Sequence, residues 1–149
     1  MNPELQERIP IIGVWKLISF QIEKENGEVV YPFGNDARGS LIYTRSGRMS
    51  VHLMRSDRPQ FASGDQLRGT REEIKANYEG VISYYGSYEF DKEKGFVIHN
   101  IQGSLFPNWE GQGQKRFFEL SSNRLKLKSP PTLWGGGKAV AFFIFERIE

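Results

Sequence analysis

The fold is decided by one segment of the chain, Lys138-Ala139-Val140-Ala141-Phe142-Phe143-Ile144-Phe145-Glu146-Arg147. Its centre, residues 140–145, is apolar without a break. Because successive side chains of a β-strand point to opposite faces, both faces of this strand are apolar. The strand must therefore be covered on both sides, or one of its faces must line an apolar cavity.

Upstream, extended segments alternate with turn residues. Extended segments are predicted at residues 11–23, 29–31, 38–44, 48–55, 81–91, 96–103, 114–120 and 124–128. Asn26-Gly27 is a strong hairpin signal, because both central residues of a type I′ turn need a positive φ. Gly86 indicates a bend or bulge where the sheet curls. Residues 130–137 are interpreted as a connection of stiff prolines followed by flexible glycines.

One helix is predicted, at residues 71–79. Thr70 can cap its start, Glu73 completes a capping-box pattern, and Gly80 follows where a C-terminal glycine belongs. The preceding residues, 56–69, form the longest irregular segment. Loops of this length are uncommon unless they act as lids or binding loops, so we expect one of these roles.

About eight main strands at a spacing of roughly 8 to 12 residues are typical of an antiparallel sandwich or barrel. Eight up-and-down strands can close into a barrel that just holds one small ligand. We therefore predict an all-β fold, an eight-stranded antiparallel up-and-down barrel with one short helix. The prediction is a single domain over residues 1–149, with residues 1–10 as an N-terminal extension.

Composition narrows the function classes. Of the 149 residues, 20 are basic and 18 acidic, which gives a net charge of +2. Because the two signs are interleaved, they indicate a solvated surface, and we expect no nucleic-acid partner. The chain has no cysteine, which excludes disulfides, thiolate nucleophiles and zinc–thiolate sites.

Membrane and secretion signals are missing from the sequence. The mean hydropathy is −0.51, and no window approaches the ~18 apolar residues that a membrane span needs. The polar start, residues 1–10, lacks the apolar segment of a signal peptide. We therefore predict a cytoplasmic protein without a membrane span.

A second segment, residues 99–116, carries the candidate binding chemistry and has the sequence HNIQGSLFPNWEGQGQKR. It contains one of two histidines, one of three tryptophans and a run of amides that ends in an arginine. Large aromatics beside hydrogen-bonding groups suit the mouth of a binding site. The alternative is a long hairpin loop whose Phe106 and Trp109 plug the end of a core.

Two residues of this segment can act on a ligand. His99 is the candidate for proton chemistry, since its unperturbed pKa lies near neutrality; the favoured alternative is a strand histidine bonded to a backbone carbonyl. Arg116 can hold an anionic head, because a guanidinium matches a carboxylate; the alternative is a surface salt bridge. By strand parity His99 shares a face with Val97, and Arg116 shares one with Phe118.

Other candidates come from the strands and the loop. Tyrosines of the strands can direct hydroxyls into a cavity or be plain core, and amides of the loop can contact a ligand or cap the loop's own backbone. The two histidines lack metal-ligand spacing and the known nucleophile and phosphate-loop motifs are missing, so neither a metal nor a cofactor is expected. The candidate ligand-binding residues are Tyr43, His52, Tyr84, Tyr88, His99, Phe106, Asn108, Trp109, Gln114 and Arg116.

The residues also carry a resemblance to a known family. Gly13-Val14-Trp15 matches the G-x-W signature of lipocalins, and Arg147 matches the arginine that packs across that tryptophan, where a cation over an indole is favourable. Over residues 13–147 the chain resembles the lipocalin-like domain family of short bacterial and fungal proteins, in the calycin superfamily. The other matching patterns are Tyr31 to Ala37, Leu41 to Thr44, Gly47 to Val51, Tyr85 to Tyr88, Ser104 to Trp109 with Gln114 and Arg116, and Glu146-Arg147.

The resemblance implies a calycin barrel with a central cavity. Some members of the family are associated with secondary metabolism, but the family brings no agreed activity. No catalytic residue is therefore carried over to this chain.

Two functions fit these observations. The first is a barrel that binds a small, mainly hydrophobic molecule with a polar or anionic end. The second is a cofactor-free isomerase or cyclase that acts in the same cavity on a small hydrophobic metabolite, for example one derived from a polyketide or a lipid. In that enzyme His99 would be the acid or base, and Arg116 or a tyrosine would stabilise charge. The expected partner is the small molecule. Whether the protein forms a homodimer is left open.

The barrel interior separates these functions. If His99, Arg116 and Trp109 face one cavity with a tyrosine at hydrogen-bond distance, the enzyme is favoured. If the cavity is apolar apart from one polar anchor, binding is favoured. An interior filled by large aromatics would instead indicate a third function, an interaction module without a ligand.

Overall fold

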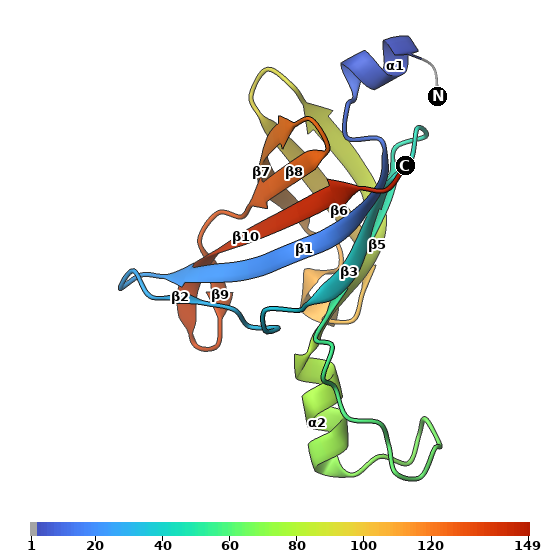
Figure 1. The fold of residues 1–149 in the computed structure, drawn as a ribbon, viewed down its shortest axis with the longest axis vertical. Helices are drawn as coiled ribbons and strands as arrows, with labels where there is room; N and C mark the ends of the chain where they lie inside the picture. Colours follow the sequence, from blue (N-terminus) through green and yellow to red (C-terminus); the bar gives the residue numbers. More distant parts are fainter. Residues whose placement is uncertain (1–2) are drawn as a thin grey trace.

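The computed structural model describes residues 3–149, and within them eight long strands close into an antiparallel barrel (Figure 1). Each of these strands pairs with the next of them along the chain, and the last pairs with the first. The predicted all-β, eight-stranded up-and-down barrel is confirmed. Its strands are β1 (Gly13–Lys24), β3 (Arg38–Tyr43), β4 (Arg48–Met54), β5 (Val81–Asp91), β6 (Phe96–Ser104), β7 (Gly113–Ser121), β8 (Arg124–Lys128) and β10 (Gly137–Arg147).

Short elements surround the barrel. The predicted helix is confirmed as α2 (Arg71–Glu79), with Thr70 as its N-cap and a complete capping box. A two-residue strand, β2 (Val29–Val30), pairs with the end of β1. A further helix, α1 (Pro3–Arg8), lies outside the barrel, in the expected N-terminal extension (Figure 1). The first two residues of that extension lie outside the described residues.

Two turn predictions need correction. Residues 130–137 are not a plain connection, because β9 (Thr132–Trp134) folds back onto the start of β10. Gly135 and Gly136 form the turn with φ of 64° and 92°, and Gly-Gly at those positions is itself a type I′ hairpin signal. The predicted hairpin after β1 does form, but only Gly27 has a positive φ there, so its turn is not type I′.

The predicted bulge at Gly86 is confirmed. The pairing of β5 with β6 shifts between Tyr85 and Gly86, and a side chain at position 86 would collide with the carbonyl oxygen of Asn100. Tyr84 faces the interior, whereas its neighbour Tyr85 is 53% exposed on the outside. This pair of adjacent tyrosines provides matched inner and outer positions on one strand.

One end of the barrel is closed by Trp15, which is fully buried. Its indole Nε1 donates to the Ile11 carbonyl (2.8 Å), and the guanidinium of Arg147 lies 4.3 Å from the ring centre. Arg147 also donates to the carbonyl oxygens of Pro10 (2.6 Å) and Ile12 (2.8 Å). The tryptophan–arginine contact expected from the sequence therefore ties the last strand to the chain segment that leads into the first.

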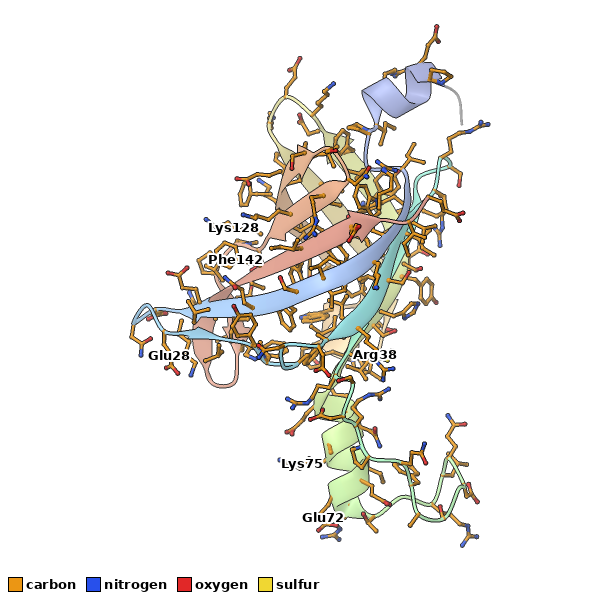
Figure 2. The ribbon with its side chains drawn as sticks, viewed as in Figure 1. Glu28, Arg38, Glu72, Lys75, Lys128 and Phe142 are labelled. Atoms are coloured by element: carbon orange, nitrogen blue, oxygen red, sulfur yellow. The ribbon has the colours of Figure 1, made fainter. Side chains whose placement is uncertain are left out.

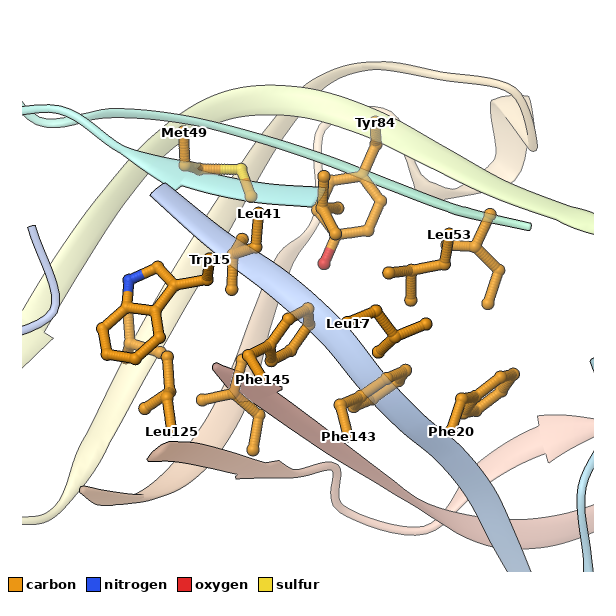
Figure 3. Packing of buried hydrophobic residues seen from close by; sticks show 14 of the residues in the cluster. Trp15, Leu17, Phe20, Leu41, Met49, Leu53, Tyr84, Leu125, Phe143 and Phe145 are labelled. Carbon is orange, nitrogen blue, oxygen red and sulfur yellow. The ribbon is translucent and has the colours of Figure 1, made fainter. Parts of the chain in front are cut away.

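The other half of the interior combines aromatic rings with aliphatic side chains such as Leu17 and Leu53 (Figure 3). Phe20 stacks on Phe143 with ring centres 4.9 Å apart, and it meets Phe33 edge-on at 5.0 Å. On the outer face of β10, Phe142 lies under the Lys128 ammonium, 5.6 Å from the ring centre (Figure 2). Of the two arrangements predicted for this strand, the structure shows the one in which its inner face lines a cavity.

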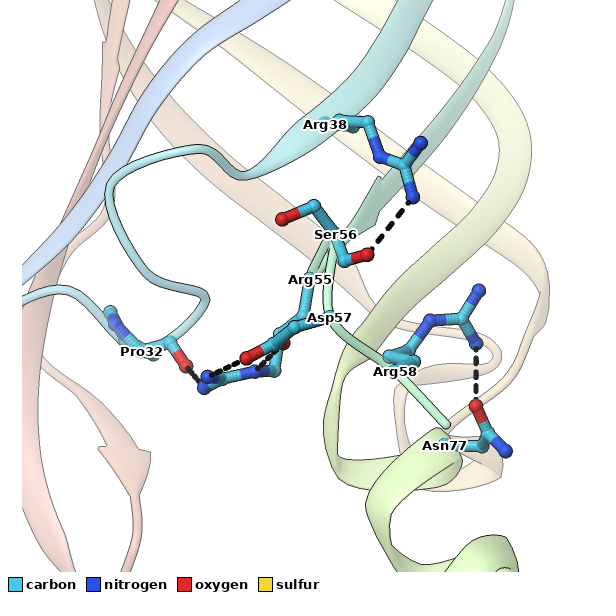
Figure 4. A network of polar contacts seen from close by, with 7 residues as sticks. All are labelled: Pro32, Arg38, Arg55, Ser56, Asp57, Arg58 and Asn77. Atoms are coloured by element: carbon cyan, nitrogen blue, oxygen red, sulfur yellow. Dashed lines mark hydrogen bonds and ion pairs between the residues drawn. The ribbon is translucent and has the colours of Figure 1, made fainter. Parts of the chain in front are cut away.

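Residues 55–80 project from the barrel as an arm that carries α2 (Figure 1). At its base Arg55 donates to the Pro32 carbonyl (2.8 Å) and pairs with Asp57 (2.8 Å; Figure 4). None of residues 56–69 lines the interior cavity. The loop predicted as a lid or binding loop therefore lies away from the interior in this structure.

Candidate functional site

The barrel encloses a cavity of about 60 Å³. Most of its walls are apolar, and the polar side chains among the described lining residues are Tyr84, His99, Arg116, Ser129 and Thr132. No carboxylate is among the residues that line it within the described chain. Its apolar walls include Phe20, Leu41, Val51, Leu53, Leu127 and Phe145.

An outer cleft of about 690 Å³ lies beside this cavity. It is bordered by the last turn of α2, by the loop after β6 and by the β9 hairpin. Four residues line both spaces: Ile82, Trp109, Leu133 and Trp134. These side chains therefore form the partition between the interior and the outside.

A buried polar cluster lies at one side of the cavity. His99 of β6 is 2% exposed, and its Nε2 lies 2.6 Å from the Tyr43 hydroxyl, while its Nδ1 lies 2.7 Å from the Tyr84 hydroxyl. In the close-up, the Tyr84 hydroxyl points toward the middle of the barrel (Figure 3). The favoured interpretation of His99, a bond to a backbone carbonyl, was wrong: its ring nitrogens contact the hydroxyls of Tyr43 on β3 and Tyr84 on β5.

Burial sets the protonation of this cluster. Loss of solvent, followed by the charge of Arg116, lowers the pKa of His99 from 6.5 to about 3. Burial raises the pKa of Tyr43 and of Tyr84, and the charge of Arg116 opposes the rise. At neutral pH all three rings are therefore uncharged, and Arg116 is the charged group beside them. Proton chemistry by His99 would need a pKa near neutrality, and the pKa of His99 lies far below that.

Arg116 faces the interior from β7 and is half-buried. Its guanidinium donates to the Gln114 side-chain oxygen (2.6 Å) and to the Lys115 carbonyl (3.0 Å). Among the side chains that the structure describes, no carboxylate forms an ion pair with it. The alternative of a surface salt bridge is thus not what the structure shows, and Gln114 orients the cation instead.

The loop segment contributes one wall. Trp109 sits in a one-turn 3₁₀ helix, η1 (Pro107–Trp109), and meets Tyr84 edge-on at 6.0 Å and Phe106 at 5.3 Å. Phe106 is 39% exposed and borders the outer cleft. Asn108 is exposed, and its carbonyl accepts a bond from Gln112. The structure therefore brings Trp109 to the cavity, Phe106 to the cleft and Asn108 to neither.

Two further candidates lie apart from the cavity. Tyr88 packs edge-on against Tyr43 (4.8 Å) and donates to the Thr44 carbonyl (2.6 Å), so its hydroxyl is committed. His52 is exposed on the outer face of β4, where its Nδ1 lies 2.7 Å from the Ser83 hydroxyl. The structure corrects the expectation that His52 belongs to the set around the interior, because strand parity turns it outward.

Sequence reasoning missed Trp134, which lines both the cavity and the cleft. Its signal was present, since it is one of three tryptophans and directly precedes the glycine run at 135–137.

The described residues hold no cluster of three metal-binding side chains. They also hold no helix with the length and apolar character that a membrane crossing requires.

This barrel, with its tryptophan–arginine closure and a partly polar interior, is matched by the model of one protein family over residues 12–148: the chain belongs to the lipocalin-like domain family. A relative in Aspergillus oryzae (strain ATCC 42149 / RIB 40) is 29% identical over 107 residues, which cover 67% of this chain and 96% of that protein. It is named 4'-hydroxy-3'-methoxypropiophenone carrier protein ppsC. No solved structure matches the chain. Family and relative together support a small-molecule-binding barrel.

Proposed function

We propose that this protein is a carrier that holds a small, mainly hydrophobic molecule with a polar or anionic end inside its barrel. The observation that carries the proposal is the gathering of Tyr84, His99 and Arg116 at one place in an otherwise apolar cavity. Apolar walls with a few convergent polar groups are typical of small-molecule sites. The name of the Aspergillus relative supports it too, because an aromatic ketone with a phenolic hydroxyl has this distribution of polar and apolar atoms.

The size of the cavity decides how such a ligand would enter. About 60 Å³ is well below the ~300 Å³ at the lower end of ligand pockets. The outer cleft is large enough, and the described residues that line both spaces are Ile82, Trp109, Leu133 and Trp134. In the proposed carrier the structure is the closed form, and a ligand enters from the cleft by displacing the two tryptophans.

The test is ligand binding followed by tryptophan fluorescence, with the 1:1 complex verified by native mass spectrometry. Two ketones are tested separately as ligands: 4'-hydroxy-3'-methoxypropiophenone and propiophenone without ring substituents. We expect Tyr84→Phe to weaken binding about tenfold, because one hydrogen bond to the ligand is lost. Tyr85→Phe, the outward neighbour, should leave the affinity unchanged. If neither ketone binds the wild-type protein, or if Tyr84→Phe binds as tightly as wild type, the proposal fails.

A second candidate function is the cofactor-free isomerase or cyclase. One observation favours it: His99, Arg116 and Trp109 line one cavity, with Tyr84 at hydrogen-bond distance from the histidine. Since the pKa of His99 is about 3, the proton donor in such an enzyme would be the Tyr84 hydroxyl, with Arg116 stabilising charge. A product of unchanged mass but altered chromatographic retention, formed by wild type and not by Tyr84→Phe, would identify the enzyme.

A further inference from the structure

The polar cluster holds one more hydrogen than its own contacts use. A neutral histidine offers one N–H donor and one nitrogen acceptor, and each tyrosine hydroxyl offers one hydrogen. His99, Tyr43 and Tyr84 thus bring three hydrogens to two contacts, of 2.6 and 2.7 Å. One hydroxyl hydrogen is left for a third partner.

The surroundings of the two tyrosines decide which hydroxyl keeps the spare hydrogen. Tyr43 is 1% exposed, packs against the Tyr88 ring and is not among the residues that line the cavity. A donor buried there without an acceptor would cost about 1–3 kcal/mol. Tyr43 therefore donates to His99 Nε2, and His99 Nδ1–H donates to the Tyr84 oxygen. The hydrogen of Tyr84, which lines the cavity, is the free one.

Arg116 adds a second set of donors beside Tyr84. Two of its contacts go to Gln114 and Lys115, and a guanidinium carries five N–H groups. The other titratable groups around this point are neutral: Tyr43 from β3, Tyr84 and Tyr88 from β5, and His99 from β6. Further around the barrel from β7, the strands β8 and β10 line the cavity with the apolar side chains Leu127, Phe143 and Phe145. This side of the cavity therefore offers hydrogen-bond donors and positive charge.

We propose that Tyr84 O–H and Arg116 N–H form an oxyanion site that binds the ionised form of an acidic oxygen on the ligand, in the first place a phenol. This inference rests on the proposed carrier function and specifies its ligand. On binding, the phenol O–H bond breaks, its proton passes to solvent water, and Arg116 stays protonated. Donors and a cation in a low-dielectric site favour the charged oxygen over the neutral hydroxyl, so the bound phenol is a stronger acid than the free one.

The test uses 4-nitrophenol, whose phenolate is followed by its visible absorbance, and 4-nitroanisole, the methylated counterpart that cannot ionise. We expect the pKa of bound 4-nitrophenol to fall by at least about one unit, which corresponds to about tenfold tighter binding of the phenolate. Arg116→Gln should abolish the shift while 4-nitroanisole still binds. Lys115→Gln is the matched control, because Lys115 lies on the outer face over the Phe96 ring.

The outcomes distinguish failure of the oxyanion site from failure of the proposed carrier function. If 4-nitrophenol and 4-nitroanisole bind equally, or if Lys115→Gln removes the shift as well, the oxyanion site is refuted and the carrier stands. If neither compound binds, the carrier is refuted together with it. The wild-type protein offers a further check without any substitution: ¹⁵N NMR should show His99 protonated at Nδ1. Protonation at Nε2 would place the spare hydrogen on Tyr43 and overturn the inference.

Discussion

His99 shows how a single residue changes character between sequence and structure. As a free side chain it titrates near neutrality, but burial between two tyrosines and the nearby charge of Arg116 lower its pKa to about 3. A neutral imidazole donates to one hydroxyl and accepts from the other, whereas a protonated one can only donate, because it has no acceptor nitrogen. In the proposed carrier, its role is therefore to position the Tyr84 hydroxyl for the ligand.

The lowered pKa of His99 makes a prediction about stability. Between pH 6.5 and about 3 the unfolded chain binds a proton at this residue and the folded chain does not. Its contribution to the free energy of unfolding is thus complete above pH 6.5 and is lost as the pH falls toward 3, by up to about 1.4 kcal/mol per pH unit.

Urea unfolding at several pH values measures this slope. The His99→Gln protein should lose part of the slope that wild type shows between pH 6.5 and 4. The exposed histidine supplies the control, so His52→Gln should keep it. Equal slopes in all three proteins would show that His99 is protonated alike in both states.

At the level of elements, the partition between cavity and cleft is made by two short pieces, η1 and β9. Each contributes one tryptophan, Trp109 and Trp134, and each is short: η1 is a single 3₁₀ turn, and β9 pairs only with the start of β10. Short surface elements are drawn from the less stable parts of a fold. The proposed route for a ligand requires that these two elements move while the barrel strands stay paired.

Trp109→Ala tests whether η1 serves the site or the core. Trp109 is only half-buried and contacts Tyr84 edge-on, so its removal should weaken ligand retention at least tenfold while the Tm falls by only a few degrees, about what 1 kcal/mol produces. Fluorescence of a bound aromatic ketone measures ligand retention, and thermal melting measures the Tm. A large loss of Tm with unchanged retention would assign Trp109 to the core.

On the scale of the whole molecule, the barrel has one end closed by Trp15 and one end where the four shared lining residues separate its cavity from the outer cleft. The closed end is held by Arg147, which lies over Trp15 and donates to two backbone carbonyls of the segment before β1. These contacts join the two ends of the chain, 135 and 137 residues apart in the sequence. Closure of the barrel thus depends on contacts between residues that are far apart in the sequence.

Arg147→Leu should destabilise the whole barrel by about 1–3 kcal/mol, since the carbonyls of Pro10 and Ile12 lose their donors. The control is Arg124→Leu on β8, whose exposed 3.9 Å ion pair with Glu146 should be worth less than about 1 kcal/mol. Chemical denaturation gives both values. Similar losses from the two substitutions would mean that Arg147 is an ordinary surface arginine.

Much of the fold could be predicted from the sequence, because its signals are local. Alternation and turn residues predicted every barrel strand to within two residues of its observed start and end, and the bounds of α2 were predicted correctly. The β9 hairpin was missed although its Gly-Gly turn was visible, and α1 was missed because its short polar sequence has no periodic apolar face. Local patterns thus predicted which residues form strands, whereas the apolar last strand left open whether its inner face is covered or lines a cavity.

The partners within the site were decided only by the tertiary structure. His99 binds Tyr43 and Tyr84, which are 56 and 15 residues away in the sequence, and no local pattern specifies such pairs. The same strand parity that brings Tyr84 inside turns His52 outside, and only the closed barrel shows which face is which. By itself the sequence determined an eight-stranded barrel with polar candidates. The packing of β3, β5, β6 and β7 decided that a neutral histidine, two tyrosines and an arginine with no carboxylate partner among the described side chains meet there, because burial and charge act between residues that only folding brings together.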